Sequence, residues 1–141
     1  MNDFLRLNRL MVFFISIGFL VLGFEVYLQH YELLSEKKIM WLPIIFGTAG
    51  GLIGILIFLT FNKISYYFFW ILMLFSIFVG MSGLYLHNKW RYPIFIDFLF
   101  HGKPFNFEIL TEFTPLLAPS AFIAMGGLGI LIAIFNPWNK E

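Results

Sequence analysis

Two histidines, His30 and His87, each stand at the end of a long apolar segment. A neutral imidazole can bind haem iron, copper, zinc or non-haem iron through one ring nitrogen. If both segments are helices that end on the same side of a membrane, the two residues can share one haem or one transition-metal ion. His101, beside Gly102, is a weaker ligand candidate.

Glutamates supply the acidic candidates. Glu25 lies within the first apolar segment, and a carboxylate at membrane depth costs about 2.5–3.5 kcal/mol. We therefore expect it to face the other helices or an aqueous pocket, where it could serve proton- or ion-coupled transport. Gln29 and Glu32 continue the same helical stripe at spacings of four and seven. Glu32 and the more distant Glu108 could add oxygen ligands to a histidine site.

No spacing in the sequence is diagnostic of an enzyme. It lacks H-x-x-x-H, E-x-x-H, the P-loop pattern and G-x-S-x-G, and it has no cysteine for a thiolate site or a disulfide. Histidines at helix ends can also simply cap the helix or contact lipid headgroups. The sequence therefore gives no positive indication of catalysis.

Composition decides the class of protein. Of the 141 residues, 60% are hydrophobic and 12% are charged, whereas a soluble domain usually has about 25% charged residues. Too little polar surface remains to cover a water-soluble particle, so the lipid bilayer is the expected partner. The formal net charge of +1, without a run of Lys or Arg, does not favour nucleic acid.

Four apolar stretches have the length of a membrane-spanning helix, which needs about 20 residues. They cover residues 10–34, 39–61, 64–86 and 115–135. The connection at 87–114 contains Pro93, Gly102 and Pro104, so we expect an interfacial loop or short helices that cap the mouth of the bundle. The prediction is one all-α domain over 1–141, an integral membrane four-helix bundle.

Glycines are placed where helices can touch. They form small-residue pairs in the second, third and fourth segments: Gly47, Gly50, Gly51 and Gly54; Gly80 and Gly83; Gly126 and Gly129. Small residues allow the close backbone approach that drives helix association in lipid. Packing within the bundle is the main interpretation. The alternative is an outward association face, for which the second segment is the candidate.

Several short motifs are similar to those of a group of small, uncharacterised four-helix bacterial membrane proteins. The motifs are Glu25, the triplet 30–32, Gly83 with His87, Phe107-Glu108, and 115–119 running into 126–129. The resemblance implies a bacterial plasma membrane and the four-helix layout, but no activity. Arg6 and Arg9 before the first segment favour cytoplasmic termini by the positive-inside rule.

Three functions are compatible with these features. The favoured one is a small accessory or scaffold subunit of a larger membrane complex, associated with other subunits or with its own copies, because the chain is short and has no catalytic motif. The alternative is a metal- or haem-binding membrane protein that uses His30 and His87. The third is proton- or ion-coupled transport through Glu25.

Overall fold

The structure, a computed structural model, describes residues 3–89, 91–104, 117–135 and 138, and these form helices joined by short turns. In chain order the elements are α1 (Asp3–His30), η1 (Tyr31–Leu33), η2 (Lys38–Met40), α2 (Trp41–Thr60), α3 (Lys63–Asn88), α4 (Tyr92–His101) and α6 (Leu117–Ile134). Three stretches, 3–33, 38–60 and 63–88, are long and apolar enough to cross a membrane. The all-helical prediction is confirmed for these residues.

Local chemistry sets the break between α2 and α3. The Asn62 side chain accepts a hydrogen bond from the Ser65 backbone N–H at 3.0 Å. Ser65 Oγ in turn accepts from the Asn62 N–H at 3.0 Å, which completes a capping box. The predicted break at residues 62–63 is therefore the N-terminus of α3. The first helix begins earlier than predicted, at Asp3, and gives way to the 3-10 turn η1 after His30.

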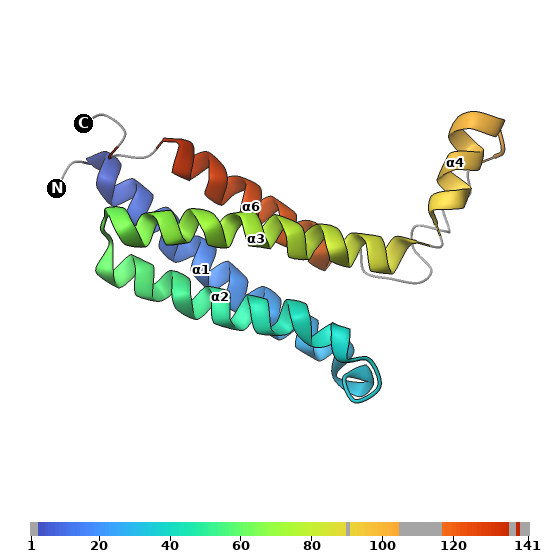
Figure 1. Ribbon diagram of the computed structural model, residues 1–141, viewed down its shortest axis with the longest axis horizontal. Coiled ribbons are helices and arrows are strands. Elements are labelled where there is room, and N and C mark those ends of the chain that lie inside the picture. Colours follow the sequence, from blue (N-terminus) through green and yellow to red (C-terminus); the bar gives the residue numbers. More distant parts are fainter. Residues whose placement is uncertain (1–2, 90, 105–116, 136–137, 139–141) are drawn as a thin grey trace.

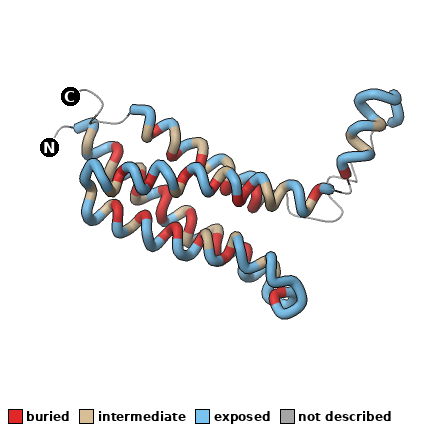
Figure 2. The backbone as a smooth tube through the Cα atoms, viewed as in Figure 1, coloured by how far each residue is buried: buried red, intermediate tan, exposed pale blue. Residues whose placement is uncertain are grey.

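The long helices form two antiparallel pairs, α1 with α2 and α3 with α6 (Figure 1). The pairs also contact each other, α1 against α6 and α2 against α3. Buried positions follow the facing sides of these helices, and the outer sides are exposed (Figure 2). We call the end that holds both chain termini the terminal end, and the end where α1 leads into α2 the loop end.

The predicted cap over the mouth of the bundle is not observed in the described part of the connection. Residues 92–101 form α4, which begins after the end of α3 and points away from the other helices (Figure 1). Pro93 stands in its first turn, and Gly102 closes it in the left-handed region at φ 62°. The second expected piece, 105–113, lies outside the described residues.

Backbone contact joins α1 to α2. A Cβ atom on Gly47 would lie 2.6 Å from Gly23 Cα, so at this point the two backbones touch without side chains between them. Gly51 packs against Leu20, and Gly54 packs against Ser16. The glycine face of the second segment is therefore internal, with Gly50 nearest Leu72 of α3, and association with another protein through this face stays a prediction.

A similar seam joins α3 to α6. A Cβ on Gly80 would lie 2.6 Å from the Pro119 carbonyl oxygen, and one on Gly126 would lie 2.8 Å from the Met73 carbonyl oxygen. Ser76, fully buried between the helices, donates a hydrogen bond to the Phe122 carbonyl at 2.6 Å. Each pair is thus held by close backbone approach.

Directional bonds tie the helices at the terminal end, both within each pair and between the pairs. The buried Tyr66 hydroxyl of α3 donates to the Ile132 carbonyl of α6 at 2.8 Å and lies 3.1 Å from Asn8 Oδ1 of α1. Arg9 of α1 donates from Nε to the Phe58 carbonyl of α2 at 2.9 Å, and its guanidinium lies over the Phe58 ring. The helices are consequently tied together here, whereas at the loop end the two pairs diverge (Figure 1).

Gly47→Ala tests the seam between α1 and α2. The added methyl group must push the helices apart, and overpacking of this kind costs about 1–3 kcal/mol. We expect a clearly lowered midpoint of thermal unfolding in detergent. Gly127→Ala is the matched control, because a Cβ there meets nothing within 4 Å. Equal midpoints for the two variants would contradict the contact.

Candidate functional site: a cavity between the helix pairs

A cavity of about 630 Å³ opens at the loop end, where the two helix pairs diverge. Its lining includes the buried residues Val26, Val79, Ala118 and Phe122 and, at its more exposed end, Gln29, His30, Lys37, His87 and Lys89. We call this space the loop-end cavity. Ligand sites commonly have this size and this mixture of apolar walls with a few polar groups.

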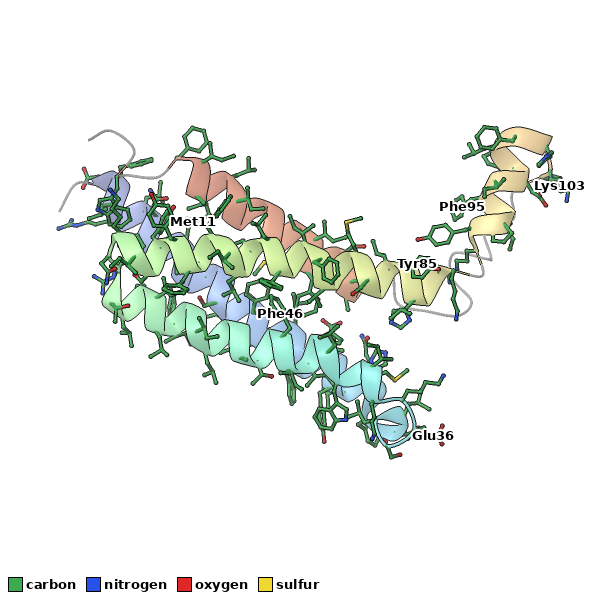
Figure 3. All side chains as sticks on the ribbon, in the orientation of Figure 1. Met11, Glu36, Phe46, Tyr85, Phe95 and Lys103 are labelled. Carbon is green, nitrogen blue, oxygen red and sulfur yellow. The ribbon has the colours of Figure 1, made fainter. Side chains whose placement is uncertain are left out.

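Three aromatic rings close the inner end of the cavity. Phe122 of α6 lines it and lies 6.0 Å, between ring centroids, from both Phe19 of α1 and Phe46 of α2. Figure 3 shows Phe46 between the helix pairs, whereas Glu36 lies at the far tip of the α1–α2 pair. Side-chain packing rather than backbone contact therefore separates the pairs here, and it leaves room toward the loop end.

The structure brings the two predicted histidines together. The ring centroids of His30 and His87 lie 5.7 Å apart, with an angle of 52° between the ring planes. The rings are half-buried, and both line the loop-end cavity. They meet because α1 and α3 run in the same direction and end on the same side, as the sequence predicted.

A backbone hydrogen bond orients the His30 ring. His30 Nδ1 lies 2.9 Å from the Val26 carbonyl oxygen, one turn earlier in α1. A carbonyl only accepts, so Nδ1 carries the proton and the neutral ring keeps its lone pair on Nε2. This is the arrangement that commonly fixes a metal-binding imidazole. His30 is thus prepared to act as a ligand through Nε2.

The number of protein ligands near His30 and His87 determines whether they could hold a bare metal ion or haem. Two imidazoles that bind one metal at about 2.0–2.1 Å have ring centroids roughly 5 Å apart at a tetrahedral angle and roughly 6.3 Å apart on opposite faces of a haem, and the observed 5.7 Å lies between these distances. Within the described residues, however, no group of three or more His, Cys, Asp or Glu could hold a metal ion. A bare zinc ion usually takes three or four protein ligands. Haem needs axial ligands alone, because the macrocycle supplies the other four.

The two candidate glutamates within the described residues, Glu25 and Glu32, do not join the site. Glu25 is exposed and accepts a hydrogen bond from Gln29 Nε2 at 3.2 Å, and the exposed Glu32 accepts from the Tyr31 hydroxyl at 2.8 Å. Neither lines the cavity, and because Glu25 is exposed, the expectation that it faces the other helices is wrong. Val26 and His30 occupy the inward face of α1 instead. Glu108 lies outside the described residues.

His101 belongs to a separate cluster on α4. Its Nδ1 lies 3.1 Å from Asp97 Oδ1, and Lys103 Nζ lies 2.6 Å from Asp97 Oδ2. The hydrogen bond from Lys103 holds the pKa of the Asp97 carboxyl below its usual range. All three residues are remote from the loop-end cavity, so His101 can serve as a control for the other two histidines.

The sequence did not single out the basic residues of the site. Lys37 and Lys89 line the cavity, yet in the sequence they read only as the usual flanks of apolar segments. Arg91, fully buried just after α3 but not part of the cavity lining, donates from Nη1 to Asn88 Oδ1 at 2.7 Å. The spacing of three residues between Asn88 and Arg91, directly after His87, was the sequence feature that could have indicated this hydrogen bond.

Comparison with known proteins gives no further assignment: the chain matches no protein-family model, no curated protein and no solved structure. The function is accordingly inferred from the geometry of the loop-end cavity.

A crosslink can test the convergence of α1 and α3. The natural chain has no cysteine, so His30→Cys/His87→Cys introduces a unique pair of thiols. We expect a short bifunctional thiol reagent to join the two positions in high yield, measured by mass spectrometry of the digested protein. The control pair, His30→Cys/His101→Cys, should remain unlinked because α4 points away. Similar yields for both pairs would contradict the arrangement.

Proposed function

We propose that the chain is an integral membrane protein of the bacterial plasma membrane, in which α1, α2, α3 and α6 form a four-helix bundle. Large apolar side chains cover its outer surface; Phe14 and Phe78, for example, are 64% and 68% exposed. Soluble monomers rarely expose apolar surface on this scale, and lipid would cover it. The described part of the last helix, Ala118–Ile134, reaches the lower limit of spanning length, about 17 residues. Both termini would lie in the cytoplasm.

Within this bundle, the loop-end cavity would bind haem, which His30 and His87 would hold. The observation that carries the proposal is the meeting of two histidines from different helices, 5.7 Å apart, on one cavity. The buried apolar wall suits the porphyrin ring, and the fixed Nδ1–H of His30 leaves Nε2 for the iron. The small number of protein ligands favours haem over a bare metal ion.

Such a protein would act as a small accessory subunit that carries electrons for a larger membrane complex. Haem supplies one-electron chemistry, and the protein supplies binding and orientation. The short chain contains no catalytic motif, so oxidation or reduction of a substrate would fall to partner subunits. Because the α2 glycines are internal, the face that binds a partner would lie among the exposed apolar sides of the helices.

A haem titration of the protein in mild detergent tests this proposal. We expect binding at one haem per chain and a shifted Soret band typical of a six-coordinate iron. His30→Ala and His87→Ala should each weaken binding at least tenfold, because each removes an axial ligand. His101→Ala should bind like the natural protein, since this residue lies on α4.

Helical circular dichroism and the elution volume of each variant would show whether it remains folded. Unchanged binding by both folded cavity variants would overturn the haem assignment. Stoichiometric copper or zinc in the porphyrin-free protein, lost in the same two variants, would instead assign a bare metal site.

A further inference from the structure

We infer that the loop-end cavity selects an anionic amphiphile, with acid groups held by Lys37 and Lys89 and an apolar body directed inward. This inference rests on the proposed function, since haem is a ligand of this class with two propionate carboxylates on an apolar ring. It adds a claim about charge that is independent of the iron. The site would then distinguish ligands with free acid groups from neutral ones of the same shape.

The charges of the lining carry this inference. Lys37 and Lys89 are the charged residues among the described lining positions, and no Asp or Glu is found there. Acids do occur at this end of the molecule: Glu25, Glu32 and Glu36 are not lining residues, but Glu25 accepts a hydrogen bond from Gln29, which does line the cavity. Cations without acids among the charged lining residues attract carboxylate or phosphate groups.

The two lysines come from different parts of the fold. Lys37 lies between η1 and η2, in the connection of the α1–α2 pair, and Lys89 follows the last residue of α3. Both are exposed, whereas Phe122 and Val26 at the other end of the cavity are 1% and 3% exposed. Positive charge is thus confined to the open end, and the buried end is apolar.

This polarity fixes the orientation of a bound ligand. An apolar body gains roughly 25 cal/mol for each Å² removed from water, so it occupies the inner wall. Acid groups are costly to bury without a partner, so they remain at the open end beside the lysine ammonium groups. Two acid groups on one edge of a planar molecule could each meet one lysine.

Three porphyrins separate the role of the acid groups from that of the iron. Haem has both features, haem dimethyl ester has iron but no free acid, and metal-free protoporphyrin IX has the acids but no iron. Binding to the full-length protein in detergent would be measured by Soret absorbance and by quenching of tryptophan fluorescence. The proteins compared would be the natural chain, Lys37→Gln/Lys89→Gln, and the control Lys38→Gln, whose side chain does not line the cavity.

We expect the natural protein to bind haem at least tenfold more tightly than haem dimethyl ester, which differs only in its acid groups. The double variant should lose this preference, while Lys38→Gln keeps it. High salt should reduce the preference by screening the charges. Equal binding of acid and ester, or an unchanged preference in the double variant, would overturn the inference.

These measurements distinguish failure of the haem proposal from failure of the anionic-ligand proposal. Histidine-dependent haem binding without any acid preference would leave the haem assignment standing and remove the anionic selectivity. Lysine-dependent binding of protoporphyrin IX without a histidine-dependent Soret shift would remove the haem assignment and support the selectivity. Absence of binding by all three porphyrins would overturn both.

Discussion

Direct backbone contact between helices is the constraint on which the rest of the structure depends. At Gly23 and Gly47 the helices α1 and α2 meet without side chains between them, and Gly80 and Gly126 give α3 and α6 the same close approach. In an apolar medium, such packing replaces the hydrophobic effect as the source of helix association. It yields two tight pairs, and the space between the pairs is left to larger side chains.

The loop-end cavity follows from this division of contacts. Between the pairs, aromatic rings such as Phe46 and Phe122 keep the helices apart in the middle, and polar bonds through Tyr66 hold them at the terminal end. At the loop end the two pairs diverge (Figure 1). His30 and His87 can therefore share a space there, and the basic residues stand at its opening.

The break between α2 and α3 was predictable because it depends on local composition, whereas the start of α1 at Asp3 was not predicted. The meeting of His30 with His87 also followed from counting segments, since alternate helices end on the same side. The direction of single side chains did not follow. Glu25 is exposed because Val26 and His30 lie on the face of α1 that points into the bundle. Only the contacts between helices determine which face of α1 points inward.

The Tyr66 bonds have a mechanical consequence for the opposite end of the molecule. They tie α3 to α6 and to α1 at one end of these long helices, so this end acts as a pivot. A small rotation about this point barely alters the packing beside it but moves the far ends of the helices by a larger distance. The width of the gap beside His30 and His87 therefore depends on these bonds at the terminal end as well as on the aromatic rings between the pairs.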